Sequence, residues 1–214
     1  MKNTVTELVF ILDRSGSMAG LEMDTIGGFN SMLKKQKSQE GTCYVTTMLF
    51  DNEFRLLHDR IDIRGIKEMS EEEYQVGGST ALLDAMGMCI RKIENVQRNT
   101  LQEYKSDNVM FVIITDGEEN SSRDYNIKDI RQMIEYQKSK NAWEFIFLGA
   151  NIDAVETARM YGISKDRAQN FHPDGQGVTL NFEAISDAIS HYRCASVMPD
   201  TWNEEISKDY KKRK

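Results

Sequence analysis

Runs of consecutive apolar residues alternate along the chain with segments in which apolar residues recur every three or four positions. Short apolar runs are typical of buried β-strands, and the wider spacing is typical of helices that bury one face. We therefore expect strands over residues 7–12, 43–50, 54–63, 109–115 and 143–148, and a short last strand within 169–177. Strands that alternate with helices predict an α/β fold.

The helical spacing fills the segments between these strands. The apolar positions that define it are Ile26, Phe29 and Leu33; Leu82, Met86, Cys89 and Ile93; Ile127, Ile130 and Ile134; and Ile185, Ile189 and Tyr192. A further short helix is expected over 154–161, before Gly162. The pair Gly27-Gly28 weakens the first of these helices, because glycine lowers helix propensity. Asn126 precedes the third helix and is a good N-cap residue.

The link between the second and third strands is too short for a helix. Only Asp51, Asn52 and Glu53 separate 43–50 from 54–63. Parallel neighbours need a crossover of about a dozen residues or more, whereas antiparallel neighbours can be joined by a tight hairpin. These two strands are therefore predicted to be antiparallel.

Composition adds a charge balance and a class of protein. The chain has 214 residues, of which 34 are acidic and 27 are basic, so its net charge is −7. This length suits one domain of ordinary to large size, or at most two small ones. The acidic balance argues against binding to a nucleic-acid backbone, which usually needs a basic face.

Cysteine spacing and the length of apolar runs bear on the compartment. Cys43, Cys89 and Cys194 stand far apart with no C-x-x-C pair, so we expect neither a disulfide framework nor a zinc cluster. The first apolar run ends at Asp13 and is too short for a signal peptide. No run is long enough to span a membrane. We therefore expect a soluble, cytoplasmic protein with no membrane partner.

Small polar side chains stand where two of the predicted strands end and where a glycine-rich loop opens a helix. They are Asp13, Ser15 and Ser17 after the first strand, Thr80 after the loop Gly77-Gly78-Ser79, and Asp116 after the 109–115 strand. In open α/β sheets, ligands bind beyond the carboxyl ends of strands where the strand order reverses. If the first strand and the 109–115 strand are neighbours, all five side chains converge on that crevice.

The five side chains offer two carboxylates and three hydroxyls. These are hard oxygen donors, which suit Mg²⁺, Mn²⁺ or Ca²⁺ rather than zinc. Two carboxylates neutralise little beyond the charge of the ion itself, so a bound ion remains a Lewis acid with coordination positions open. A carboxylate that comes from outside the chain is the obvious further ligand.

The three motifs, in this order and at these strand ends, resemble the metal-ion-dependent adhesion site of the von Willebrand factor type A domain. The resemblance covers roughly residues 4–196. It implies a doubly wound, Rossmann-like sheet, mostly parallel with one antiparallel edge strand and with helices on both faces. Residues 1–200 are accordingly predicted to form the domain, and 201–214 a basic tail that is frayed from residue 208 onward.

The same resemblance implies a role for each site residue. Ser15, Ser17 and Thr80 would be direct or switchable metal ligands. Asp13 and Asp116 would act largely through waters and orient the site. None of these positions departs from the pattern of the family, so the resemblance implies a site competent to bind its ion, most simply Mg²⁺.

The function that the resemblance implies is protein binding that depends on a divalent metal. A partner protein would supply an Asp or Glu that completes the coordination, and no bond would be made or broken. The predicted lack of a secretion signal brings the chain closer to the intracellular bacterial members. Some of these work beside AAA+ ATPases or in stress and defence assemblies, and a partner of that kind is expected by analogy.

Two other functions stay open. One is a metal-dependent hydrolase or phosphoryl-transfer enzyme that uses the same ion, although the motif loops carry no positioned base and no phosphate-binding lysine. The other is a structural subunit whose metal only rigidifies the loops. A calcium-binding EF-hand that starts at Asp13 is excluded, because Met18 stands where its sixth position needs glycine and Asp24 where its twelfth needs glutamate.

The remaining polar residues receive a structural interpretation. Asp51, Glu118 and Glu119 are expected to be solvated loop charges, with a charged rim around the site as the alternative. Cys43 and Cys89 fall on apolar faces and are expected in the core. The histidines are scattered and are interpreted as surface or incidental residues: His58, His172 and His191.

Overall fold

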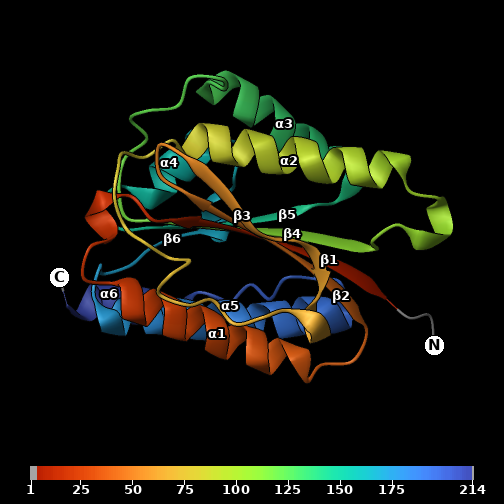
Figure 1. Ribbon diagram of the computed structural model, residues 1–214, viewed down its shortest axis with the longest axis horizontal. Helices are drawn as coiled ribbons and strands as arrows, with labels where there is room; N and C mark the ends of the chain where they lie inside the picture. The colour runs from red at the N-terminus through yellow and green to blue at the C-terminus, as the bar shows by residue number, and fades with distance from the viewer. Residues whose placement is uncertain (1–3, 214) are drawn as a thin grey trace.

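A sheet of six strands runs through the middle of the molecule (Figure 1), of which the computed structural model describes residues 4–213. Its spatial order is β3-β2-β1-β4-β5-β6. The strands are β1 (Val5–Asp13), β2 (Thr42–Phe50), β3 (Phe54–Asp62), β4 (Asn108–Thr115), β5 (Glu144–Gly149) and β6 (Ala168–Asn170). Every neighbouring pair is parallel except β2 and β3, which are antiparallel. The predicted mostly parallel sheet with one antiparallel edge strand is confirmed.

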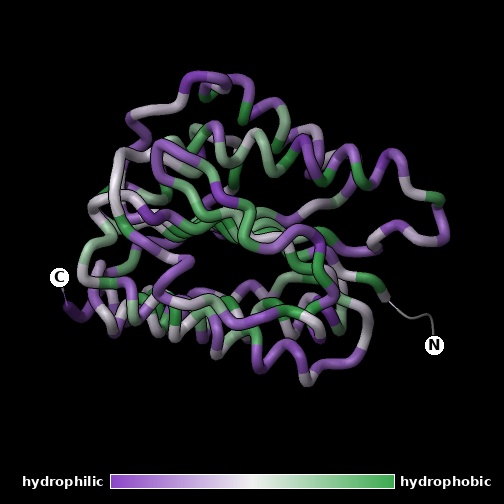
Figure 2. The backbone as a smooth tube through the Cα atoms, in the orientation of Figure 1, coloured by the Kyte–Doolittle hydropathy of each residue, from purple (hydrophilic) through white to green (hydrophobic). Residues whose placement is uncertain are grey.

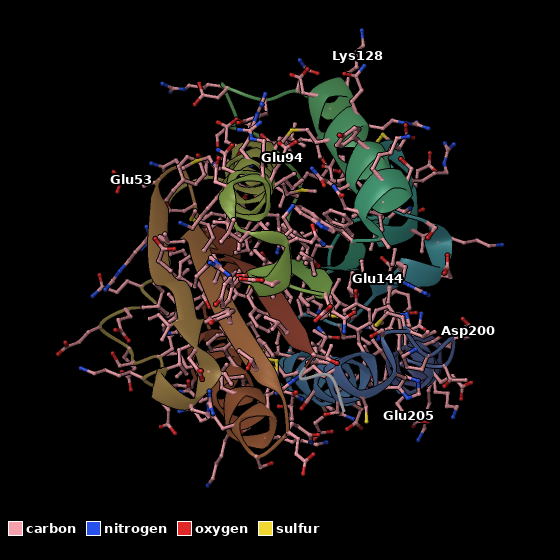
Figure 3. The ribbon with its side chains drawn as sticks, turned by 90° about the vertical axis from the view of Figure 1, so that its right-hand side faces the viewer. Glu53, Glu94, Lys128, Glu144, Asp200 and Glu205 are labelled. Atoms are coloured by element: carbon pink, nitrogen blue, oxygen red, sulfur yellow. The ribbon has the colours of Figure 1, made fainter. Side chains whose placement is uncertain are left out.

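Helices cover both faces of this sheet (Figures 1 and 3). In the described part of the chain they are α1 (Glu22–Lys37), α2 (Leu82–Asn99), α3 (Ile127–Asn141), α4 (Ala154–Met160), α5 (Gly175–Ala195) and α6 (Glu204–Lys212). α2, α3 and α4 pack on one face, and α1 and α5 on the other, where α6 lies against α5 and β6. Across residues 4–213, none of the helices has the length and apolar character needed to cross a membrane.

The winding of the chain changes direction at β1. This strand pairs with β2 on one side and with β4 on the other. The chain moves outward from β1 through β2 and β3 and then returns to β4, so the crevice between the carboxyl ends of β1 and β4 is the usual place for a ligand in such a sheet. The two strands that lead into Asp13 and Asp116 are therefore neighbours, as the convergence of the motifs requires.

Both faces of the central strands are buried, which explains why they are continuous apolar runs. In β1, Leu8, Phe10 and Leu12 join the core under α1 and α5, whereas Val9 and Ile11 join the core under α2 and α3. All five side chains are at most 1% exposed. Figure 2 shows this layer as hydrophobic colour in the middle of the tube. Because burying each such side chain stabilises by about 1.5–3 kcal/mol, the strand that carries Asp13 is firmly placed.

The N-cap of α3 is confirmed, but the first apolar residue of this helix lies outside the core. Asn126 Oδ1 accepts a hydrogen bond from the backbone N–H of Asp129 at 3.1 Å, and the Asp129 carboxylate accepts one from the N–H of Asn126 at 3.2 Å. Ile130 and Ile134 are fully buried as predicted, whereas Ile127 is 43% exposed. Ile127 lies in the first turn beside the cap, and the helix buries its apolar face only from Ile130 onward.

The prediction of a frayed tail over 208–214 is wrong for the described residues, because most of this segment belongs to α6. Residue 214 lies outside the described residues. Trp202 and Ile206 are 6% and 2% exposed and join the core under α5. Trp202 lies in the turn before α6 and Ile206 lies in its first half, so both ends of this connection are anchored in the core. Most residues of this segment are charged or polar, so the sequence does not indicate that these two apolar residues are buried.

His58 lies inside the fold rather than on its surface. Its side chain is 4% exposed, its Nδ1 lies 3.0 Å from Thr47 Oγ1, and its ring stacks on that of Phe29. Burial lowers the pKa of His58, so the ring is neutral at pH 7 and serves packing. Cys43 and Cys89 are buried in the core, as expected.

A matched pair of substitutions in α1 tests how closely this helix packs on α5. A Cβ atom on Gly28 would lie 2.4 Å from a ring carbon of Phe182, whereas a Cβ atom on Gly27 would meet no heavy atom within 4 Å. We expect Gly28→Ala to destabilise the protein by about 1–3 kcal/mol through overpacking. Gly27→Ala should stabilise it by up to about 1 kcal/mol, since alanine has the higher helix propensity. Urea unfolding measures both, and equal effects would contradict the close contact.

Candidate metal centre

Backbone hydrogen bonds join the loop after β1 to the glycine-rich loop. The N–H of Gly16 donates to the carbonyl of Gly78 at 3.1 Å, and the N–H of Gly77 donates to the carbonyl of Arg14 at 2.9 Å. Gly78 adopts a φ of 72°, which glycine tolerates without strain. The two loops therefore lie edge to edge, and the segment that leads into Thr80 is held beside Ser15 and Ser17.

Thr80 is also tied to the loop that follows β4. Its N–H donates to Asn120 Oδ1 at 2.9 Å, and its carbonyl accepts from the N–H of Asn120 at 3.0 Å. A Cβ atom on Gly117 would lie 3.3 Å from Ser17 Oγ and 3.7 Å from Thr80 Oγ1. The hydroxyls of Ser17 and Thr80, which come from two different loops, thus converge on Gly117 in the third.

Asp13 is fixed at the end of β1 through both of its carboxylate oxygens. Oδ1 accepts a hydrogen bond from the N–H of Ser15 at 2.7 Å, and Oδ2 accepts one from Thr115 Oγ1 at 2.5 Å. The Tyr74 hydroxyl donates to the main-chain carbonyl of Asp13. Burial raises the pKa of Asp13, the hydrogen bonds from Ser15 and Thr115 oppose this shift, and the charge of Asp116 adds to it. The structure thus orients this carboxylate before any ligand arrives.

Asp116 is buried and only half satisfied. Its side chain is 1% exposed, and Oδ1 accepts a hydrogen bond from Ser17 Oγ at 2.6 Å. Ser17 Oγ in turn lies 3.1 Å from Ser15 Oγ. Among the described residues, Oδ2 of Asp116 has no hydrogen-bond partner, and burial raises the pKa of this carboxyl group. An unpaired buried carboxylate oxygen costs free energy, and a hydrated cation would remove this cost.

All five predicted residues are therefore brought together at one end of the sheet. They provide only oxygen atoms, from two carboxylates and three hydroxyls, which is the donor set of a hard divalent cation. Within residues 4–213, no group of three or more His, Cys, Asp or Glu side chains could hold a metal ion, so a site here depends on its hydroxyls. That Asp13, Ser15, Ser17, Thr80 and Asp116 bind an ion remains a prediction.

The three acidic residues near the site differ from one another. Asp51 Oδ2 lies 3.1 Å from Arg14 Nε, so this charge is paired. Glu119 accepts hydrogen bonds from the N–H groups of Leu83 at 2.9 Å and Ser122 at 2.7 Å, so it joins its loop to α2. Glu118 is the one of the three that is exposed. Solvated loop charge therefore describes Glu118, whereas Asp51 and Glu119 are structural.

Three residues hold the site in place, and the sequence did not predict this role for any of them. Thr115 binds the Asp13 carboxylate, Tyr74 binds the Asp13 carbonyl, and Asp84 accepts hydrogen bonds from the loop after β4. Thr115 could have been found, because it precedes Asp116 at the end of the same strand. Tyr74 and Asp84 carry no local signal, since each acts on a segment far from it in the sequence.

Comparison with known proteins places this fold. At the level of sequence, no family model and no curated protein matches the chain. Among solved structures, a von Willebrand factor type A protein from Catenulispora acidiphila aligns with a TM-score of 0.59 and 12% identity, over 86% of this chain and 42% of that one. The chain has a von Willebrand factor type A-like fold.

Two further structures share this type A-like fold. The PilB minor pilin from Streptococcus sanguinis aligns with a TM-score of 0.62 and 12% identity, over 92% of this chain and 64% of the pilin. Proximal thread matrix protein 1 from the mussel byssus aligns with a TM-score of 0.55 and 10% identity, over 87% of this chain and 46% of that protein. The chain thus spans between 42% and 64% of the length of these three structures. At such identities the likeness is one of fold.

Proposed function

We propose that this protein is an interaction module that binds a partner protein through a divalent cation, most simply Mg²⁺, with Mn²⁺ and Ca²⁺ as alternatives. The observation that carries the proposal is the buried Oδ2 of Asp116, which has no partner among the described residues and lies on the side chain that Ser17 contacts. Type A-like folds often mediate protein interactions, which fits a binding function. No catalytic step is part of the proposal.

Each site residue has a distinct role in this proposal. Asp13, held by Ser15 N–H and by Thr115, keeps the first loop in place and contributes negative charge. The oxygens of Ser15, Ser17 and Thr80 would hold the ion directly, and Asp116 would do so largely through water. When bound, the cation supplies a coordination position for a carboxylate from the partner.

The carboxylate that Ser17 contacts, that of Asp116, is not oriented by a further group, because its Oδ2 has no hydrogen-bond partner among the described residues. Ser15 and Ser17 are hydrogen-bonded to each other, and Ser17 donates to the Asp116 carboxylate. A nucleophilic serine would need a neighbouring base that is itself oriented by a third group. This arrangement favours binding over hydrolysis or phosphoryl transfer.

The cellular setting belongs to the proposal as well. By analogy with the intracellular bacterial members of the type A family, we propose a cytoplasmic role beside an AAA+ ATPase or within a stress or defence assembly. The cysteines Cys43, Cys89 and Cys194 are all free thiols, which agrees with a reducing compartment. The partner would present an Asp or Glu on an exposed loop or end.

The proposal predicts that carboxylate peptides bind only when metal is present. Immobilised protein would be offered peptides that carry one Asp or Glu, and the matched peptides with Asn or Gln. In Mg²⁺ the acidic peptides should be retained at least about tenfold more strongly, and EDTA should remove the difference. Thr80→Val, which replaces a hydroxyl by a methyl group, should behave like EDTA.

The control for this experiment is Thr100→Val, because Thr100 follows α2 at the opposite end of the sheet. This variant should retain the acidic peptides as the wild type does. Equal retention in Mg²⁺ and EDTA would contradict metal-dependent binding. Retention of the Asn and Gln peptides alongside the acidic ones would contradict the role of the carboxylate.

A further inference from the structure

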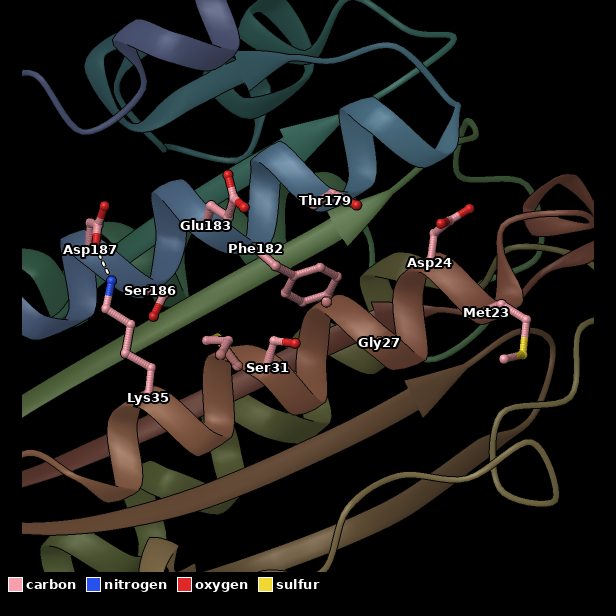
Figure 4. Close-up of a pocket in the computed structure, with 12 residues that line it drawn as sticks. Met23, Asp24, Gly27, Ser31, Lys35, Thr179, Phe182, Glu183, Ser186 and Asp187 are labelled. Carbon is pink, nitrogen blue, oxygen red and sulfur yellow. Dashed lines mark hydrogen bonds and ion pairs between the residues drawn. The ribbon is translucent and has the colours of Figure 1, made fainter.

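A groove runs between α1 and α5, on the face of the molecule formed by these two helices (Figure 4). Its volume is about 590 Å³. Met32 and Phe182, each 2% exposed, form its floor together with Gly27 and Gly28. Met23, which is 63% exposed, lines the end nearest the start of α1. The groove thus offers apolar contact area to a ligand that reaches it from outside.

Two glycines give the groove its shape. Gly28 lets α1 approach the Phe182 ring, because any side chain there would collide with the ring. Gly27 is the next residue along the helix, and a Cβ atom on it would point into open space. The hollow is therefore open beside Gly27. It is closed at its far end by the ion pair between Lys35 and Asp187, which crosses from one helix to the other in Figure 4.

The open half of the groove is acidic. Among the described residues that line it, Lys35 is the one cation, and Asp187 pairs with it. Asp24 on α1 and Glu183 on α5 remain on the two walls. The same two carboxylates line an adjoining hollow beside Gln176, and Glu183 also lines a third hollow together with Glu205 of α6. The two charges are spread along the groove: Asp24 Oδ2 would lie 2.6 Å from a Cβ atom on Gly175, the first residue of α5, and Glu183 follows eight residues further along this helix. A cation in the groove would therefore meet negative charge at either of two places.

We propose that this groove docks a short segment of a partner protein in which a Lys or Arg is followed by small apolar residues. The cation would lie beside Asp24 or Glu183, and the apolar side chains would pack on Met23, Gly27 and Phe182. The Lys or Arg is favoured by the negative charge of the groove. The apolar residues next to it in the segment are favoured by the exposed Met23 and the apolar floor. The site is separate from the metal centre and does not depend on it.

The length of the groove sets the length of the segment. Met23 and Lys35 lie on the same helix, about 18 Å apart at a rise of 1.5 Å per residue. An extended peptide covers that span with about six residues, at about 3.3 Å each. The ion pair of Lys35 and Asp187 marks where the segment must end or turn away.

Titration of the whole ¹⁵N-labelled chain with a peptide pool tests this site. The pool contains peptides of about six residues with Lys or Arg at one position and Ala, Ser, Leu or Met elsewhere. A second pool has Glu in place of the cation. The cationic pool should shift the amide resonances of α1 and α5 around Gly27 and Phe182, and the Glu pool should not. Raising the salt concentration should weaken these shifts, because exposed charges are screened.

Two groove variants make the test specific. Gly27→Leu places a side chain in the open space without a clash and should abolish the shifts. Asp24→Lys combined with Glu183→Lys should weaken binding at least about tenfold. Glu103→Lys, an exposed charge reversal in the loop between α2 and β4, should change nothing. Ser17→Ala should also leave groove binding intact, so a failure of the metal site is distinguished from a failure of the groove.

The same titration can overturn the proposal in three ways. The cationic pool could leave the groove resonances unmoved, or shift them equally in Gly27→Leu. The Glu pool could bind as strongly as the cationic pool. The groove resonances could shift with protein concentration alone, which would identify a second copy of the chain as the occupant. Any of these results excludes a basic partner segment.

Discussion

Titration of Mg²⁺ into protein freed of metal by a chelator should give a binding heat that the Ser15→Ala/Ser17→Ala variant lacks. These two hydroxyls lie 3.1 Å apart, and one of them donates to Asp116 at 2.6 Å. Removing both takes away two of the three neutral oxygens of the centre. It also leaves Asp116 Oδ1 without its donor in a buried site. We expect the affinity for Mg²⁺ to fall at least about 100-fold, since even the loss of a supporting residue costs 10–100-fold.

Ser139→Ala is the matched control for this titration, because Ser139 lies in α3 and its hydroxyl donates only to the carbonyl of Tyr136. This variant should bind Mg²⁺ as the wild type does. An unchanged heat in Ser15→Ala/Ser17→Ala would place the ion elsewhere. If the wild type gives no heat, the titration is repeated with excess acetate to supply the missing carboxylate, and no heat in that case would contradict the metal centre.

Thermal unfolding with and without Mg²⁺ separates binding from a merely structural metal. A ligand present at 100 times its dissociation constant stabilises the folded state by about 2.7 kcal/mol. Both a structural ion and an interaction site would show this shift. Only an interaction site would also retain acidic peptides in a manner that depends on metal. The two measurements together decide between these functions.

The strands could be predicted because burial on both faces leaves a strong signal, whereas their order in the sheet was implied by the resemblance of the motifs. A central strand such as β4 has all eight residues buried, and those from Val109 to Ile114 appear in the sequence as an unbroken apolar run. Asp116 follows it directly, and the change from apolar to polar marks the end of the strand. The convergence of the site residues then follows from the topology, because parallel strands end at the same edge.

The parts that could not be predicted depend on contacts between distant segments. Arg193 near the end of α5 donates to the carbonyls of Gln36 at 2.7 Å and Glu40 at 3.1 Å, at the end of α1. Arg193 is buried, with 8% of the residue exposed, and nothing in the neighbouring sequence indicates this burial. The docking of α6 through Trp202 and Ile206 is of the same kind. A charged residue reveals its burial only once its partners are known.

Asp84→Ala is expected to destabilise the protein by about 3 kcal/mol. The Asp84 side chain is 4% exposed at the start of α2. Its carboxylate accepts hydrogen bonds from three consecutive backbone N–H groups in the loop between β4 and α3. The donors and distances are Arg123 at 2.8 Å, Asp124 at 2.9 Å and Tyr125 at 2.8 Å. An unpaired buried donor costs about 1–3 kcal/mol, and water can reach part of this loop.

The loop in question begins at Asp116, so Asp84 also supports one side of the metal centre. The Tyr125 ring lies against α2, where a Cβ atom on Gly87 would approach it to 2.6 Å. Without the Asp84 carboxylate, this packing must hold the loop together with Glu119 and the hydrogen bonds between Thr80 and Asn120. For a chain of this size, 3 kcal/mol corresponds to a fall in the melting temperature of about 6–12 °C.

Two variants make the Asp84 experiment decisive in urea and thermal unfolding. Asp84→Asn keeps one acceptor oxygen and should lose only about 1 kcal/mol. Asp124→Ala removes an exposed carboxylate in the same loop and should stay within about 0.5 kcal/mol of the wild type. If Asp84→Ala loses no more than Asp124→Ala, the three hydrogen bonds do not hold the loop. The rigidity of the centre on the Asp116 side must then come from Glu119, the Tyr125 ring and the hydrogen bonds between Thr80 and Asn120.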